Sequence, residues 1–216
     1  MSTDAIWNWS ESRDDFTVSF FGRGAATSAS DLEPRLSPAP GAVSWLRQIH
    51  SKRVCSARPG LAGEGDALIT SAPGLALAIA TADCVPVLMA DRQRIAAVHA
   101  GWRGLVAGVL GAALESFGPA AAQTDVWIGP AIGPCCYEIG DDVADRLRTV
   151  GTDAALSTGP TGRSHADLQA IARHQLRTVR QIHQIDLCTR CTEDSLASYR
   201  RDGETAGRNW SAIWRT

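Results

Sequence analysis

Three residues of metal-binding or nucleophilic types follow short apolar runs in the sequence. His50 follows VSWLRQI, Cys84 lies between LALAIAT and VPVLMA, and His99 ends IAAVH. Because strand ends gather at one edge of a sheet, we expect that these side chains can meet. Two imidazoles and one thiolate suit Zn²⁺ or copper and leave a fourth position for water or substrate. A metal-free Cys84 nucleophile activated by histidine, or three unconnected residues, would also satisfy the spacing.

A second group with chemical potential follows His99 directly. The segment GWRG, residues 101–104, precedes apolar residues at helical spacing. A helix N-terminus offers free N–H groups and a partial positive charge, and Arg103 adds a guanidinium. This arrangement could hold phosphate or a carboxylate next to His99. An Arg103 that is simply solvated at the start of a helix is the alternative.

Acidic side chains accompany these residues. Asp83 precedes Cys84, and Glu64 and Asp66 lie in GEGDALIT. Carboxylates near a metal can orient a ligating histidine or carry a proton. The alternative for each is an ordinary surface acid.

The C-terminal stretch SYRRDGETAGRNWSAIW contains several arginines close to a turn. Tyr199, Arg200, Arg201 and Arg208 could close over an anionic substrate from there. A hairpin with solvated arginines would have the same composition.

The remaining cysteines include a C-x-x-C pair, Cys188 and Cys191, which could be half of a zinc site or a redox pair. No second C-x-x-C exists, and the adjacent Cys135 and Cys136 are poorly spaced for joint tetrahedral ligation. The pattern therefore favours packed thiols at a turn.

The elements that must position these residues are predicted from apolar periodicity. Strands are expected at 17–22, 43–49, 66–70, 75–81, 85–90, 95–99, 126–128 and 211–214. Helices are expected over 105–117, from a cap at Asp141 or Asp142 to Arg148, and over 168–182. Strands and helices mix without regular alternation. We therefore expect an α/β (mixed α+β) fold, with mixed sheets or a sandwich flanked by outer helices, as a single domain over residues 1–216.

Bulk composition limits the possible function classes. The chain has 216 residues, 44% of them hydrophobic and 20% charged, and a net charge of -2. These values are typical of a soluble globular protein and do not indicate binding to nucleic acid or to an anionic membrane. No apolar stretch is long enough to span a membrane, and the N-terminus lacks a secretory pattern. We expect a cytoplasmic protein with reduced thiols.

Several motifs, taken in order, resemble those of a known family. They are RQIHSKRV, EGDALIT, ALAIATADCVPVLMAD, IAAVHAGWRG, IGPAIGPCCYEIG and CTRC…SYRRDGETAGRNWSAIW, and they extend from Arg47 to Trp214. The sequence resembles the YfiH-like laccase-domain family, whose members are also called multicopper polyphenol oxidoreductases and purine nucleoside phosphorylases. The resemblance implies a single YfiH/CNF-like domain in which β-sheets pack between outer helices.

The resemblance also implies a metal site and an activity. The family's metal ligands correspond to His50, Cys84 and His99, which implies Zn²⁺, with copper as the alternative. The implied activity is phosphorolysis of adenosine, inosine, guanosine and methylthioadenosine, with adenosine deamination as a second activity. Nucleoside and phosphate would then be the partners of a monomer or a small homo-oligomer.

On this interpretation the site residues have separate roles. His50, Cys84, His99 and Asp83 would be catalytic, and Arg103, Arg23 and Arg201 would contact substrate or phosphate. The chain departs from the family at Ser51, where a glycine is common, and around Arg23 in FFGRGAATSAS, where a Gly-Gly-Val-Ser turn is usual.

Two other classes of enzyme remain open. A copper-dependent polyphenol oxidase needs several coppers, and five histidines are few for that purpose. A metal-free Cys84–His99 hydrolase would fit the editing of peptidoglycan precursors, a role attached to some bacterial relatives.

Overall fold

Two six-stranded sheets form the body of the protein. The computed structural model describes residues 6–13 and 15–216. The first sheet runs in the order β1 (Asn8–Ser12), β2 (Phe16–Phe21), β15 (Asn209–Arg215), β7 (Leu75–Thr81), β3 (Ala42–Arg47) and β5 (Gly60–Glu64). The second runs in the order β14 (Gln181–Gln184), β10 (Asp125–Ile128), β8 (Val85–Ala90), β9 (Ile95–Ala100), β6 (Ala67–Thr70) and β4 (Val54–Ser56). Both sheets contain parallel and antiparallel pairs.

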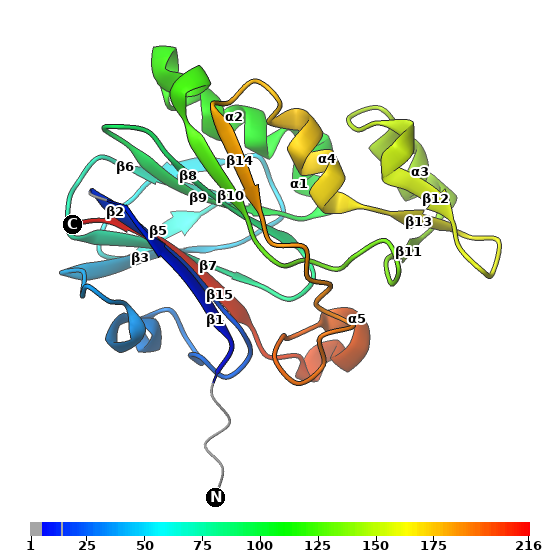
Figure 1. The fold of residues 1–216 in the computed structure, drawn as a ribbon, viewed down its shortest axis with the longest axis horizontal. Coiled ribbons are helices and arrows are strands. Elements are labelled where there is room, and N and C mark those ends of the chain that lie inside the picture. The colour runs from blue at the N-terminus through cyan, green and yellow to red at the C-terminus, as the bar shows by residue number, and fades with distance from the viewer. Residues whose placement is uncertain (1–5, 14) are drawn as a thin grey trace, which may run out of the picture.

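The two sheets pack face to face because their central strands are apolar on both sides. Along β7, Leu77 and Ile79 belong to the core between the sheets, whereas Ala76 and Ala78 face the core on the opposite side. Successive side chains of a strand point to opposite faces, so this continuous apolar run serves two cores. Figure 1 shows the two layers of strands one above the other.

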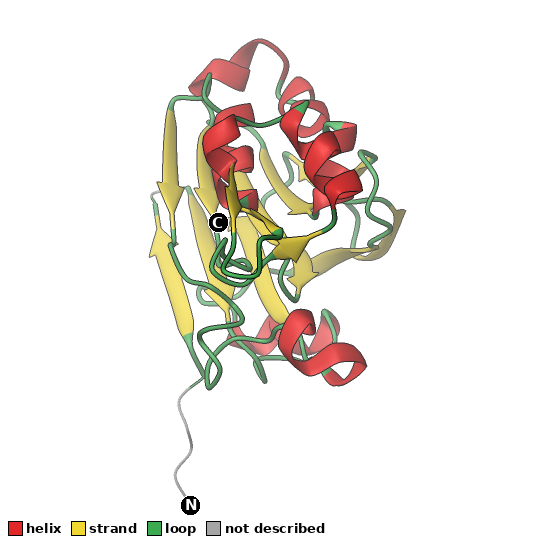
Figure 2. Cartoon of the chain, turned by 90° about the vertical axis from the view of Figure 1, so that its right-hand side faces the viewer, coloured by secondary structure: helices red, strands yellow, loops and turns green. Residues whose placement is uncertain are grey.

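Helices cover the outer face of the second sheet. They are α1 (Trp102–Ala107), α2 (Val109–Glu115) and α4 (Leu168–Gln175), and a further helix, α3 (Asp141–Arg148), packs beside α1. Their apolar side chains form one core cluster with those of β8, β9 and β10. Figure 2 shows these helices in red beside the yellow strands. None of the helices in the described part of the chain has the length and apolarity that a membrane crossing requires.

Smaller elements complete the chain. A three-stranded sheet has the order β11 (Glu138–Ile139), β13 (Ser164–Ala166) and β12 (Leu156–Thr158). The short helices are η1 (Ser30–Arg35), η2 (Gly118–Gln123), η3 (Asp153–Ala155), α5 (Tyr199–Asp202) and η4 (Gly203–Thr205). The predicted mixed α/β fold, with sheets flanked by helices, is confirmed.

Three predicted helices differ from the observed ones. The helix predicted over 105–117 begins at Trp102 and is interrupted at Gly108, whose φ of 85° lies in the left-handed region. The helix predicted over 168–182 ends at Gln175, because 181–184 form β14, which pairs in parallel with β10. The N-cap of α3 is Gly140, and no side chain caps that helix.

The predicted strands are confirmed at their centres, with shifted ends. The strand expected at 43–49 ends at Arg47, and the strand expected at 66–70 begins at Ala67. Both shifts free residues for the candidate site, because the segment after Arg47 leaves the sheet and the Asp66 side chain accepts its N–H groups.

Candidate active site

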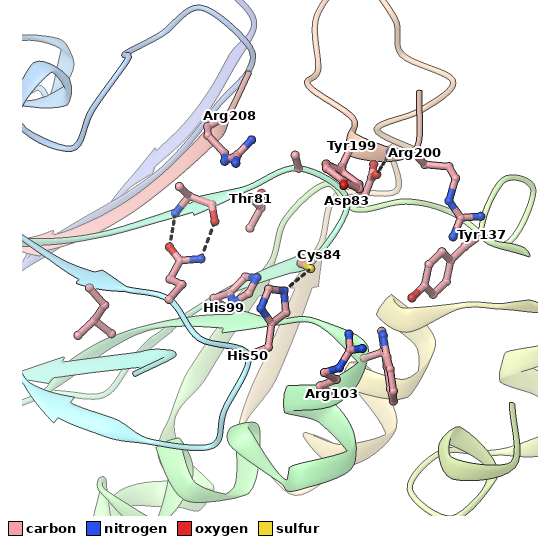
Figure 3. Close-up of a pocket in the computed structure, with 15 residues that line it drawn as sticks. His50, Thr81, Asp83, Cys84, His99, Arg103, Tyr137, Tyr199, Arg200 and Arg208 are labelled. Atoms are coloured by element: carbon pink, nitrogen blue, oxygen red, sulfur yellow. Dashed lines mark hydrogen bonds between the residues drawn. The ribbon is translucent and has the colours of Figure 1, made fainter. Parts of the chain in front are cut away.

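His50, Cys84 and His99 meet at one end of the space between the two sheets. The β8–β9 hairpin pairs Pro86 with His99, which places Cys84, just before β8, beside the end of β9. Ile95 and Ala97 point into the core between the sheets, and the period of two gives His99 the same direction. His50 approaches from the first sheet, three residues after β3 ends at Arg47 (Figure 3).

Gln48 fixes the approach of the His50 segment to β7. Its side-chain nitrogen donates to the carbonyl oxygen of Ala80 at 2.7 Å, and its side-chain oxygen accepts the Ala80 N–H at 2.9 Å. The Gln48 amide therefore makes the pair of hydrogen bonds to β7 that a further residue of β3 would make through its backbone. Sequence reasoning did not single out Gln48, although it stands two positions before His50.

The three side chains are close enough to share one ion. The Sγ atom of Cys84 lies 3.9 Å from Nε2 of His50, and the two imidazole centroids are 4.8 Å apart. One donor atom from each residue lies within 4.8 Å of the other two. A Cβ atom at Gly101 would lie 2.9 Å from the Cys84 sulfur and 3.0 Å from the His50 ring, so only glycine leaves room for this approach.

Asp66 organises both histidines. Its carboxylate accepts N–H groups from Ile49, His50 and Ser51, and it accepts the Ser51 hydroxyl. These bonds hold His50 at a φ of 58°, which is rare for a residue with a side chain. The same carboxylate lies 2.8 Å from Nδ1 of His99, and this contact leaves Nε2 of that ring to face Cys84 or a metal ion. Asp66 is fully buried.

The charges of Cys84 and His99 depend on each other. Burial would raise the pKa of the Cys84 thiol, but hydrogen bonds with His50 and His99 lower it to about 6. Burial would lower the pKa of His99, but its bonds with Asp66 and Cys84 raise it to about 9. Without a metal, the pair is therefore a thiolate and an imidazolium at neutral pH. A divalent cation would bind this thiolate and displace the proton of His99.

The donor set fits a single soft or borderline cation. Two imidazole nitrogens and one thiolate match the ligands of catalytic zinc sites, which keep one position open. Copper accepts the same ligands. Two of the other histidines have structural contacts, since His165 bonds to the Pro134 carbonyl oxygen and His183 stacks on Trp127.

A pocket of about 650 Å³ opens above the three residues. Its size is typical of a small-molecule site. Arg103, Arg200 and Arg208 contribute guanidinium groups to its lining, and Tyr137 and Tyr199 contribute aromatic rings (Figure 3). Sequence reasoning missed Tyr137, although it lies in the IGPCCYEIG motif.

Arg103 is placed to bind an anion. It lies in the first turn of α1, and its guanidinium lies 4.3 Å from the centre of the Trp102 ring. Within residues 6–13 and 15–216 this guanidinium makes no hydrogen bond, so its donors are available to a ligand. Because α1 has only six residues, the guanidinium rather than the helix end carries this interaction.

Asp83 lines the pocket, but its carboxylate is already engaged. One oxygen accepts the hydroxyl of Thr189 and the other accepts the backbone N–H of Arg200, both at 2.6 Å. Asp83 has a φ of 89°. These contacts join the loop before Cys84 to two segments that are distant in the sequence. Asp83 can therefore fix the position of the Cys84 loop.

Arg23 and Arg201 do not line the pocket. The Arg201 guanidinium pairs with Asp202 at 2.8 Å and donates to three backbone carbonyl oxygens. Arg23 donates to the carbonyl oxygen of Glu193 at 3.0 Å. The neighbouring Arg200 and Arg208 take the pocket positions instead. Spacing alone cannot distinguish Arg200 from Arg201, because adjacent residues of the short helix α5 point in different directions.

The other four cysteines of interest also converge. The sulfur atoms of Cys135, Cys136, Cys188 and Cys191 all lie within 4.8 Å of one another. Adjacent cysteines are poorly spaced for joint ligation in the sequence, yet the structure brings both of their sulfur atoms close to the C-x-x-C pair. The turn at 134–136 directs both sulfur atoms toward the C-x-x-C pair.

Comparisons with known proteins agree with this architecture. Residues 26–216 match the model of a family described as multi-copper polyphenol oxidoreductase laccase. A Pseudomonas aeruginosa protein named purine nucleoside phosphorylase PA4543 is 41% identical over 178 residues, which are 79% of this chain and 73% of that protein. An Escherichia coli K12 protein named purine nucleoside phosphorylase YfiH is 38% identical over 182 residues, covering 81% and 74%.

Solved structures share the fold. The Neisseria meningitidis protein NMB0706 superimposes with a TM-score of 0.83 at 30% identity, over 94% of this chain and 95% of that one. The Bacillus licheniformis hypothetical protein YfiH gives a TM-score of 0.83 at 26% identity, over 93% of each chain.

Proposed function

The chain belongs to the laccase-like family described as multi-copper polyphenol oxidoreductase laccase, and on that basis we propose that it is a zinc-dependent purine nucleoside phosphorylase. The observation that carries the proposal is the convergence of His50, Cys84 and His99 beneath a pocket lined with arginine and tyrosine. Relatives that are 38% and 41% identical to this chain are named purine nucleoside phosphorylases. We propose adenosine, inosine, guanosine and methylthioadenosine as substrates.

His50, Cys84 and His99 would hold the zinc ion. When bound, the ion supplies Lewis acidity toward an oxygen atom in the pocket. Asp66 keeps Nε2 of His99 directed at the site, and Gly101 leaves space for the Cys84 sulfur.

The arginines of the pocket would bind phosphate. Arg103 has free donors, and Arg200 and Arg208 add positive charge to the lining. In phosphorolysis a phosphate oxygen forms a bond to C1′ of the ribose while the bond from C1′ to the purine nitrogen breaks. The products are ribose 1-phosphate and the free purine, which gains a proton. Fixed guanidinium groups would hold phosphate in line with the breaking bond.

Tyr137 would contribute a hydrogen-bond donor. Burial and the nearby Cys84 thiolate raise the pKa of its phenol to about 12. The hydroxyl therefore keeps its proton throughout the pH range of an enzyme assay and can donate to the bound substrate. The Arg200 guanidinium lies 5.2 Å from the centre of the Tyr137 ring, so the two side chains form one wall of the pocket.

We also propose adenosine deamination as a second activity of the same site. Water would add to C6 of the purine, and ammonia would leave to give inosine. An assay that measures ammonia from adenosine without phosphate tests this activity separately from phosphorolysis.

The proposal is tested with inosine and phosphate. We expect the wild-type protein to release hypoxanthine only when phosphate is present, with one equivalent of ribose 1-phosphate. His50→Ala, Cys84→Ala and His99→Ala should each lower kcat/KM at least 100-fold. His174→Ala, which changes a histidine outside the pocket, is the control. Full purine release by Cys84→Ala and His99→Ala would reject the proposal.

A copper-dependent polyphenol oxidase is the second candidate, favoured by the description of the family. Passing four electrons to O₂ requires several coppers, and the chain has five histidines in total. Oxidation of a phenol by protein that contains several coppers per chain would favour this candidate over the phosphorylase.

A metal-free Cys84–His99 hydrolase, such as an editing factor for peptidoglycan precursors, is the third candidate. The lowered pKa of Cys84 favours it, because a thiolate is the nucleophilic form of cysteine. Activity that survives removal of zinc but is lost on alkylation of Cys84 would support this hydrolase and contradict the phosphorylase.

A further inference from the structure

Four cysteines outside the pocket lie in two loops that the second sheet brings together. Cys135 and Cys136 lie in the turn beyond β10, and Cys188 and Cys191 lie in the loop beyond β14. These strands are parallel neighbours, so their carboxyl ends, and the loops that follow, lie side by side. A parallel bridge between Ala131 and Cys188 continues the pairing beyond the strands.

The four sulfur atoms have the spacing of a tetrahedral metal site. Sγ of Cys191 lies 3.4 Å from Sγ of Cys136 and 3.7 Å from Sγ of Cys135. All four atoms lie within 4.8 Å of one another. With zinc–sulfur bonds of about 2.3 Å, the edges of a regular tetrahedron measure about 3.8 Å. Closing the observed cluster onto one ion therefore requires only small movements.

The surrounding backbone is built to receive thiolates. The Gly133 N–H donates to Sγ of Cys188 at 3.2 Å, and a bond from a backbone N–H stabilises the charged form of sulfur. A Cβ atom at Gly133 would lie 3.3 Å from the sulfur of Cys135 and 3.2 Å from Cβ of Cys188. A glycine at this position thus allows the two loops to approach each other.

Four thiolates at this separation would repel one another strongly unless a positive ion lay between them.

We propose that Cys135, Cys136, Cys188 and Cys191 form a second zinc site, separate from the His50, Cys84 and His99 group. Four protein sulfurs complete a tetrahedral shell and leave no position for substrate, so the ion is structural rather than catalytic. A tetrahedral all-sulfur set favours zinc over calcium, magnesium or manganese, which prefer oxygen ligands.

The site would hold two walls of the pocket in place. Tyr137 follows Cys136 directly, and Thr189 lies between the two cysteines of the C-x-x-C pair. Thr189 is fully buried, and its hydroxyl donates to Asp83, the residue before Cys84. An ion that joins the two loops would therefore fix the Tyr137 wall relative to the Asp83 loop.

Metal analysis of the purified full chain tests the proposal without using activity. We expect about two zinc ions per wild-type chain and about one in both Cys84→Ala and the double variant C188S/C191S. Cys55→Ser, which changes a cysteine outside both groups, should keep the wild-type content. One zinc in the wild type together with none in Cys84→Ala would overturn the second site, whatever the nucleoside assay shows.

Two further measurements keep the test informative if the double variant fails to fold. Cobalt bound to Cys84→Ala should give the intense charge-transfer absorption of a tetrahedral thiolate site. In the wild type, zinc should protect these four cysteines from alkylation, and a chelator should expose them at least tenfold. Equal labelling with and without chelator, or mapped disulfides among the four in freshly purified protein, would overturn the proposal.

Discussion

The Asp66 carboxylate links the backbone of one site residue to the ring of another. It bonds to the backbone N–H of His50 and to Nδ1 of His99, and it is fully buried. The family motif EGDALIT contains this residue, and sequence analysis placed it among the carboxylates that could orient a ligand. Its pairing with His99 could not be predicted from spacing, because β6 and β9 meet only through the fold of the sheet.

Because of Asp66, the free energy of unfolding of the metal-free protein should fall at low pH. Burial raises the pKa of this carboxyl, but bonds with His99 and Ser51 outweigh it and lower the pKa from 3.8 to about 2. The stabilisation is therefore present above pH 4 and is lost as pH falls from about 4 to 2. It amounts to about 2 kcal/mol. Urea unfolding of chelated protein at pH 5 and pH 2.5 measures this loss.

Asp66→Asn should remove that part of the pH dependence, whereas Glu64→Gln should keep it, because Glu64 is an exposed acid of the same segment. Asp66→Asn should also bind zinc at His50, Cys84 and His99 10- to 100-fold more weakly than the wild type does. A wild-type acid profile in Asp66→Asn would show that the carboxylate does not carry the effect.

Gly101 tests how closely the site is packed. In Gly101→Ala the new methyl group would meet the sulfur of Cys84 at 2.9 Å and the His50 ring at 3.0 Å. We expect zinc at the catalytic group and phosphorolysis to fall at least tenfold, with little change in secondary structure. Gly111→Ala in α2 is the matched control, because nothing lies within 4 Å of the added carbon. Equal activity in the two variants would contradict the packing argument.

At the scale of elements, the β8–β9 hairpin positions Cys84 and His99 and could be predicted from sequence. Two apolar runs joined by a short polar turn indicate antiparallel strands, and their register follows from the turn. The position of His50 could not be predicted this way, because it depends on the contact of Gln48 with a strand 32 residues away. His50 was a candidate because it follows an apolar run, and the resemblance to the family supplied its grouping with Cys84 and His99.

Element boundaries were wrong where tertiary contacts override local pattern. Val179 and Ile182 continue the helical spacing of α4, yet the chain turns there so that β14 can pair with β10. Gly108 interrupts the helix that begins after the GWRG motif, since its left-handed conformation caps α1. The same pairing of β10 and β14 brings together the loops that carry Cys135, Cys136, Cys188 and Cys191. The CTRC motif alone could not predict this cluster, because the other two cysteines are more than 50 residues away in the sequence.

Asp83 joins three segments of the chain. Kinetic measurements can distinguish this positioning role from a role in proton transfer. Asp83→Asn should weaken the ties to Thr189 and Arg200, raise KM about tenfold and change kcat little. Thr189→Val should act in the same direction. A large fall in kcat together with loss of one limb of the pH–rate profile would make Asp83 a proton carrier, as the sequence-based role assigned to it implied.

In the molecule as a whole, the core between the sheets stabilises the fold that carries the site, but its side chains take no part in zinc binding or catalysis. Leu88 is fully buried in that core. Leu88→Ala should lower the free energy of unfolding by about 2–5 kcal/mol, because it leaves a cavity, while the folded protein keeps its zinc. Leu61→Ala, at a side chain that is 51% exposed, should change stability by less than about 0.5 kcal/mol. Urea unfolding and metal analysis compare the two.

The overall layering could also be predicted, because continuous apolar strands must be covered on both faces. The order of strands within each sheet could not, since β15 at the C-terminus inserts between β2 and β7. That insertion closes the first sheet beside the pocket and places Arg208, just before β15, in its lining.

A crystal of the protein grown with inosine, measured at wavelengths above and below the zinc absorption edge, would show whether zinc and nucleoside share this site. We expect an anomalous peak within bonding distance of His50, Cys84 and His99, with the nucleoside beside it in the pocket of Arg103 and Tyr137. A nucleoside bound elsewhere, or no peak among these three residues in protein that is active, would contradict this expectation.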